Sequence, residues 1–122
     1  MILADTCIWV DHVAAGDPVL IDLLVDQEIL IHPFVVGEFF LGNVRDRSRW
    51  HGLLTSLPEF LPVRPGDVLA LIENHKLAGS GVGYVDAHLL ASVLALPGAL
   101  FWTRDKRLRG VARELGIDAG LD

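Results

Sequence analysis

The chain has 122 residues, enough for one domain with its own hydrophobic core. Hydrophobic residues make up 52% and charged residues 21%, which excludes an intrinsically disordered chain. The longest stretch without a charged residue, 87–103, has 17 residues and contains Pro97-Gly98, so a membrane-spanning helix is not expected. Without a basic, apolar leader and with one cysteine, Cys7, we expect no secretory signal, no internal disulfide and a cytoplasmic location.

In chain order, the pattern predicts a strand at 2–4, helices at 6–13 and 19–25, a strand at 28–32 and helices at 33–42 and 45–57. A strand at 60–64 and a helix at 67–77 follow, then a glycine-rich loop at 79–83 and a helix at 84–96. A strand at 99–103, a helix at 106–115 and a short edge strand from Ile117 complete the chain. This alternation predicts one α/β domain over 1–122 with a mostly parallel central sheet.

The net charge of −6 makes the chain a poor general binder of nucleic acid. Residues 1–44 contain seven acids and no Lys or Arg, whereas eight of the ten bases fall at 45–49 and 104–113. These two basic runs either form solvated helix faces or bind one stretch of nucleic-acid backbone. The mean hydropathy of +0.44 indicates apolar surface that a partner or a second copy covers.

Four acids occupy positions that suggest a binding site. Asp5 follows the first strand and Asp105 follows the strand at 99–103, at the carboxyl ends where parallel sheets place their ligands, although either residue could simply cap the next helix. Glu38 and Asp86 project from the apolar stripes of their helices, where an unpaired carboxylate is costly. No base in residues 1–44 neutralises Asp5 and Glu38. An all-oxygen set of this kind suits Mg²⁺ or Mn²⁺ and predicts a metal-dependent nuclease or phosphatase.

The motifs around these acids resemble the PIN-domain ribonucleases and, more narrowly, the VapC toxins of toxin–antitoxin pairs. The matching segments cover the start of the chain, the helix that carries Glu38, and the two motifs that carry Asp86 and Asp105: 2–6, 32–43, 83–92 and 100–108. Gly37 and His32-Pro33 depart from the usual pattern of the family, but neither departure replaces an acid.

This resemblance implies a three-layer α/β/α PIN fold in which Asp5, Glu38, Asp86 and Asp105 bind Mg²⁺ or Mn²⁺ and direct a water at an RNA phosphodiester. Thr6 and Thr103 would then be hydroxyls that orient these carboxylates. A homodimer and inhibition by a cognate VapB-like antitoxin are also implied.

Several other side chains have weaker assignments. Arg104, Lys106 and Arg107 flank Asp105 and are candidate RNA contacts, with a surface helix face as the alternative. His88 is expected on the surface of its helix and Trp102 in the core. Trp9 is expected on a dimer or antitoxin surface.

Competing functions remain open at this point. A phosphatase of the haloacid-dehalogenase type would need an acid where Cys7 stands, and a receiver-like domain would need a better placed lysine than Lys106. The histidines lack zinc-ligand spacing, and the loop at 79–83 follows no strand, so it is not a dinucleotide fingerprint. The principal alternative is a catalytically idle PIN domain that binds RNA or protein. The presence of all four acids favours the enzyme.

Overall fold

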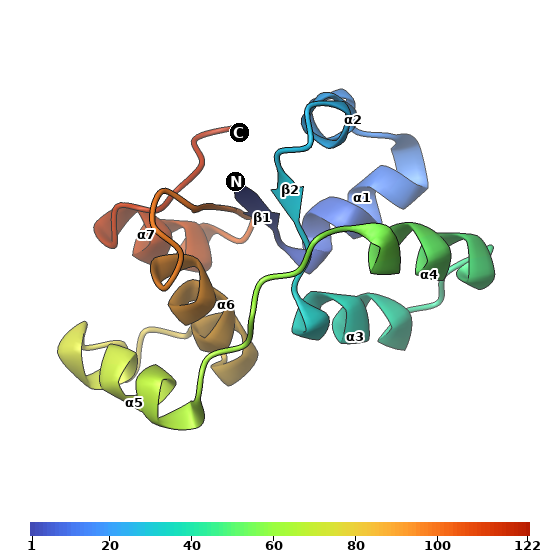
Figure 1. The fold of residues 1–122 in the computed structure, drawn as a ribbon. Helices are drawn as coiled ribbons and strands as arrows, with labels where there is room; N and C mark the ends of the chain where they lie inside the picture. Colours follow the sequence, from blue (N-terminus) through green and yellow to red (C-terminus); the bar gives the residue numbers. More distant parts are fainter.

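The computed structural model describes all residues, 1–122, as seven helices around a short parallel sheet (Figure 1). The strands are β1 (Ile2–Ala4), β2 (Ile29–Leu30) and β3 (Leu100–Trp102), in the order β2-β1-β3. In register, Ile2 lies opposite Ile29 and Leu100. Single parallel bridges from Ile31 to Glu59 and from Phe101 to Asp118 widen the sheet at both edges.

Helices cover both faces of this sheet, which confirms the predicted three-layer α/β/α architecture. Figure 1 shows four of them on one side of the strands: α1 (Thr6–Ala15), α2 (Pro18–Val25), α3 (Pro33–Leu41) and α4 (Arg47–Ser56). The other side carries α5 (Pro65–Asn74), α6 (Tyr84–Leu94) and α7 (Lys106–Glu114). One cluster of 26 buried apolar residues joins the layers. No helix is long and apolar enough to cross a membrane.

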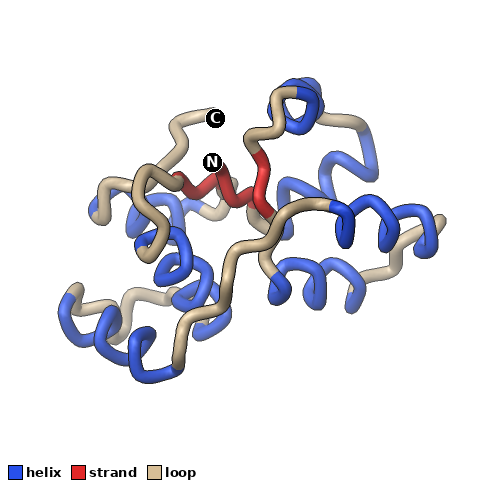
Figure 2. Tube along the Cα trace, viewed as in Figure 1, coloured by secondary structure: helices blue, strands red, loops and turns tan.

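The predicted strand at 60–64 is wrong. Figure 2 shows this segment as part of a long loop between α4 and α5. Its pairing with the sheet stops at Phe60, whose amide donates to Ile31 O over 2.7 Å. Pro62 and Pro65 have no amide to donate, so the apolar run cannot continue the ladder. The edge strand expected from Ile117 is reduced to the single bridge at Asp118.

Two expectations about single side chains are also wrong. His88 is 4% exposed and therefore does not lie on the surface. The helix α6 is buried along the whole run 87–93, because it packs against both α5 and β3. Trp9 is fully buried among the core residues and cannot form a docking surface. Trp102 lies in the core, as predicted.

Candidate active site

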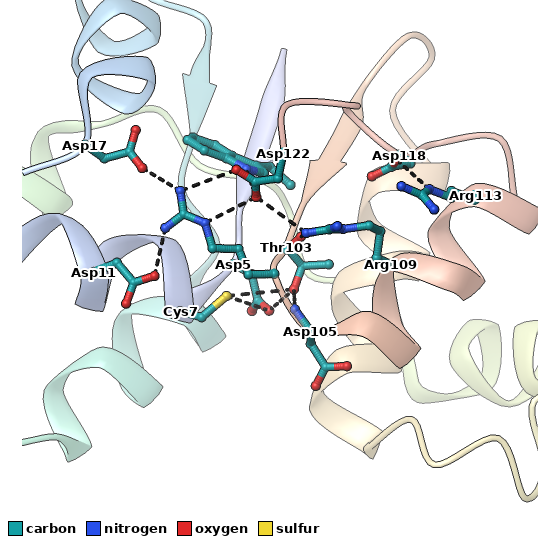
Figure 3. Close-up of polar contacts among 12 residues, drawn as sticks. Asp5, Cys7, Asp11, Asp17, Thr103, Asp105, Arg109, Arg113, Asp118 and Asp122 are labelled. Atoms are coloured by element: carbon teal, nitrogen blue, oxygen red, sulfur yellow. Dashed lines mark hydrogen bonds and ion pairs between the residues drawn. The ribbon is translucent and has the colours of Figure 1, made fainter.

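The ends of two neighbouring strands bring Asp5 and the segment 103–105 together. The Asp5 amide donates to Trp102 O over 2.9 Å, which aligns the ends of β1 and β3. Beyond this bond, the hydroxyl of Thr103 donates to Asp5 Oδ2 over 2.8 Å and accepts from the Asp105 amide at 3.2 Å (Figure 3). Both Thr103 and Asp5 are buried, at 1% and 7% exposure. The hydroxyl thus fixes the orientation of the Asp5 carboxylate.

Asp5 and Asp105 also cap the helices that follow them. Asp5 Oδ1 accepts from the Thr6 amide at 2.8 Å, and Asp105 Oδ1 accepts from the Leu108 amide at 3.0 Å. Each cap uses one carboxylate oxygen, and Asp105 Oδ2 has no hydrogen-bond partner in the protein. The capping interpretation is therefore correct, and it leaves oxygen atoms available for a ligand.

Glu38 reaches the same region from α3. Its Oε1 accepts a long hydrogen bond, 3.4 Å, from the hydroxyl of Thr6, the first residue of α1. Thr6 is therefore next to Asp5 along the chain and bonded to Glu38 across the α1–α3 contact. Glu38 itself is exposed, so its carboxylate faces solvent.

Asp86, in the first turn of α6, reports how close the acids lie. Burial first, and then the negative charges of Asp5, Glu38 and Asp105, together raise the pKa of this carboxyl to about 6. The fold therefore brings the four predicted acids close enough for Asp5, Glu38 and Asp105 to act electrostatically on Asp86.

The acids suit a divalent cation by charge and by donor type, because hard cations prefer carboxylate oxygens. Their side chains do not form a complete coordination shell. No three His, Cys, Asp or Glu side chains lie close enough together to hold a metal ion.

Cys7 is a neighbour of this region that the sequence did not indicate. Its thiol contacts Asp5 Oδ2 at 3.7 Å and Thr103 Oγ1 at 3.8 Å (Figure 3). Burial raises the pKa of the Cys7 thiol, so the group stays neutral. Its position two residues after Asp5 in the first turn of α1 was the only available signal.

Arg104 does not point at the acids. Its guanidinium forms ion pairs with three aspartates: Asp11 at 2.7 Å, Asp17 at 2.5 Å and Asp122 at 3.2 Å. Figure 3 labels these three aspartates. Asp122 also accepts from Trp102 Nε1 at 2.9 Å and lies 3.6 Å from Arg109. Arg104 thus ties β3 to α1, to the start of α2 and to the last residue of the chain, and an RNA contact is better sought at Lys106 and Arg107.

Lys106 and Arg107 are exposed and have no carboxylate within ion-pair distance, unlike Arg104, Arg109 and Arg113. Arg107 lies over Gly81 in the glycine-rich loop. A Cβ at Gly81 would be 2.6 Å from Arg107 Nη1, and Gly81 has a φ of +86°. This close approach explains a glycine that the sequence indicated only as loop.

Comparison with known proteins agrees with the geometry. Residues 2–114 match the family model described as PIN domain. Two curated relatives, each named Ribonuclease VapC32 and each from a strain of Mycobacterium tuberculosis, are 44% identical over 117 residues. The match covers 96% of this chain and 94% of each relative. The chain therefore belongs to the PIN-domain family and, within it, to the VapC group.

Proposed function

We propose that this protein is a metal-dependent endoribonuclease and the toxin of a toxin–antitoxin pair, acting as a single PIN domain over 1–122. The observation that carries the proposal is the convergence of Asp5, Glu38 and Asp105 on Asp86, where burial first and then the charges of these three acids raise the pKa of its carboxyl. The membership of the chain in the VapC group supports RNA as the substrate.

In this function, Asp5, Glu38, Asp86 and Asp105 would hold Mg²⁺ or Mn²⁺. When bound, such a cation lowers the pKa of a coordinated water and stabilises negative charge on a phosphodiester oxygen. Thr103 keeps the Asp5 carboxylate in one orientation, and Thr6 supports Glu38 in the same way. The net reaction adds water across one P–O bond of the RNA and leaves a phosphate monoester and a hydroxyl.

The basic side chains that follow Asp105 would bind the RNA backbone. Lys106 and Arg107 follow Asp105 directly and carry unpaired positive charge. They are suited to hold phosphates on either side of the cleaved bond, while contributing no sequence readout of their own. Arg104 contributes indirectly, because its three ion pairs fix the segment that carries Thr103 and Asp105.

The test is RNA cleavage by the purified chain with Mg²⁺ or Mn²⁺, with EDTA and with an Asp86→Asn variant. A matched control is Asp67→Asn, which makes the same change in the first turn of another helix, α5. We expect cleavage that requires metal, is lost with Asp86→Asn and is kept with Asp67→Asn. Cleavage that survives Asp86→Asn contradicts the site. RNA binding without any cleavage would favour the idle PIN domain instead.

A homodimer and a VapB-like antitoxin complete the proposed function, in the cytoplasm where the RNA is. Large apolar side chains support such partners because they are strongly exposed: Leu41 at 89%, Leu61 at 84% and Val25 at 74%. Light scattering after gel filtration distinguishes a monomer from a dimer, with Leu41→Lys and Leu61→Lys as the variants that should weaken association.

A further inference from the structure

The start of α3 and the second half of α6 meet at a buried hydrogen bond between His32 and Ser92. The His32 Nε2 and Ser92 Oγ atoms are 3.0 Å apart, and the two residues are 0% and 2% exposed. No other hydrogen bond joins the segment 32–41 to α6. This bond is therefore the one directional link between the two helices that carry Glu38 and Asp86.

The neighbouring hydrogen bonds determine which atom of the pair donates. His32 is the N-cap of α3, and its Nδ1 accepts from the Phe34 amide at 3.0 Å. A neutral imidazole whose Nδ1 accepts carries its proton on Nε2. The Ser92 hydroxyl donates its only proton to His88 O at 3.0 Å, so its oxygen accepts from His32 Nε2. Each polar atom of the pair therefore has a partner, and buried networks that are satisfied in this way are rigid.

The surroundings of His32 keep its ring uncharged. Burial first, and then the charge of His88, lower the pKa of His32 to about 4. At neutral pH, Nδ1 therefore keeps the lone pair that caps α3. The Phe34 ring lies 5.0 Å from the rings of both His32 and His88 between centroids. Aromatic packing of this kind is favourable over about 4.5–7 Å, so it is the hydrogen bond that sets the helix positions closely.

Both partners of the bond lie six residues from an acid of the candidate site. Glu38 follows His32 on α3, and Asp86 precedes Ser92 on α6. Since an α-helix rises 1.5 Å per residue, each acid is roughly 9 Å along its helix from the bond. A tilt or slide of either helix at the bond therefore moves one carboxylate relative to the other. The only hydrogen bond of the Glu38 side chain itself is the long one from Thr6, at 3.4 Å.

We propose that the His32–Ser92 bond sets the separation of Glu38 and Asp86, which makes His32 and Ser92 positioning residues for the divalent cation. The inference rests on the proposed function and deepens it, because it assigns the control of metal affinity to side chains outside the four acids. Neither side chain contacts the cation or the RNA. Ligands that are held in place bind a cation more tightly than ligands that must first be brought together.

Two substitutions remove the bond from its two sides, His32→Asn and Ser92→Ala. The Asn amide oxygen takes the place of Nδ1 and still caps α3, but the side chain is too short to reach Ser92. Electron paramagnetic resonance of free Mn²⁺ gives the Kd of the ion without RNA. We expect each variant to raise this Kd by about tenfold, the lower end of the effect of residues that orient metal ligands. The control Ser56→Ala removes another hydroxyl bonded within its own helix and should leave the Kd unchanged.

His32→Gln separates positioning from capping. The Gln amide nitrogen takes the place of Nε2 and still donates to Ser92, whereas the cap on the Phe34 amide is lost. We expect a lower melting temperature in EDTA, with a Mn²⁺ Kd close to that of the wild type. If the Kd instead follows the loss of melting temperature across the variants, whether or not the bond to Ser92 is kept, the pair is only structural and the proposal is overturned.

The double variant tests whether the two residues act through one bond. At a temperature well below every melting transition, His32→Asn with Ser92→Ala should raise the Mn²⁺ Kd no further than either change alone. A rise of about a hundredfold, the product of the two single effects, shows independent roles and overturns the proposal.

The wild-type chain distinguishes failure of this inference from failure of the proposed function. Mn²⁺ binding and Asp86-dependent RNA cleavage by the wild type, with an unchanged Kd in His32→Asn and Ser92→Ala, would overturn this inference alone. A wild-type chain that binds no Mn²⁺ and cleaves no RNA would refute the proposed function, and this inference with it.

Discussion

Thr103 donates its hydroxyl to Asp5 Oδ2 over 2.8 Å, although the two residues are 98 positions apart. The bond joins the carboxyl ends of the adjacent strands β1 and β3, and the hydroxyl oxygen of Thr103 also accepts from the Asp105 amide. One buried hydroxyl thus controls the position of two of the four acids, which makes it the most sensitive support of the candidate site.

Thr103→Val should therefore damage both stability and activity. It removes the hydroxyl that donates to Asp5 Oδ2, which we expect to cost about 1–2 kcal/mol of unfolding free energy. Loss of a group that orients a metal ligand typically lowers activity by about 10–100-fold. Urea unfolding and RNA cleavage measure the two effects. Thr103→Ser, which keeps the hydroxyl, is the control, and equal activity of the Val and Ser variants would contradict this role.

The stability of the metal-free protein should depend on the charge of Asp86. Its pKa is raised from 3.8 to about 6 in the fold by burial and by the three neighbouring carboxylates. The folded state therefore binds more protons than the unfolded state in this window, and the free energy of unfolding falls as the pH rises through it. We expect a loss of about 1–2 kcal/mol after discounting for solvent screening at this partly exposed side chain.

A substitution and an added metal ion should each offset this loss of stability. Asp86→Asn should flatten the pH dependence between about pH 4 and 6, since the substituted side chain does not ionise. Mg²⁺ or Mn²⁺ should raise the melting temperature of the wild type at neutral pH, because a ligand that binds only the folded state stabilises it. Thermal melts in EDTA and in added metal measure both, with Asp67→Asn as the control. A melting temperature that stays the same when either metal is added would argue against a cation site among these acids.

Gly81→Ala should displace Arg107. The new Cβ would be 2.6 Å from Arg107 Nη1, and the φ of +86° is itself unfavourable for alanine. Gly79→Ala provides the control, because it has a similar φ of +76° but nothing within 4 Å of the added atom. Both variants should lose about 1 kcal/mol of stability from the backbone.

Only Gly81→Ala should also weaken RNA binding, by roughly fivefold to tenfold if one phosphate contact is lost. The double variant Gly81→Ala with Arg107→Ala should then bind RNA as weakly as Arg107→Ala alone. Full additivity of the two changes would show that Arg107 acts independently of the loop.

Arg104→Gln should destabilise the fold more than a surface charge change does. Burial raises the pKa of Asp17, but the hydrogen bond from Arg104, the hydrogen bond from the Leu20 amide and the charge of Arg104 together leave the pKa below its ordinary value. Without Arg104, that 11%-exposed carboxylate loses its partner, and we expect a cost of roughly 1–3 kcal/mol. Arg113→Gln, which breaks a more exposed pair with Asp118, should cost about 0–1 kcal/mol. Urea unfolding of the two variants makes the comparison, and equal losses would contradict the network.

The sequence by itself determined the alternation of strands and helices and the positions of the four acids within it. Asp5 and Asp105 follow apolar runs that are typical of buried strands, and Asp86 interrupts an apolar helix face. These are local signals, because hydrophobic period and the place of a charge within it depend on residues only a few positions apart.

Only the tertiary structure decided which side chains are covered and which distant charges meet. His88 and Trp9 are buried because neighbouring layers close over both sides of their helices, which the period of one helix does not reveal. Arg104 turns to Asp11, Asp17 and Asp122 because the fold brings residues 93, 87 and 18 positions away around its guanidinium. Contacts of that range follow from the packing of whole elements, so no short segment of the chain encodes them.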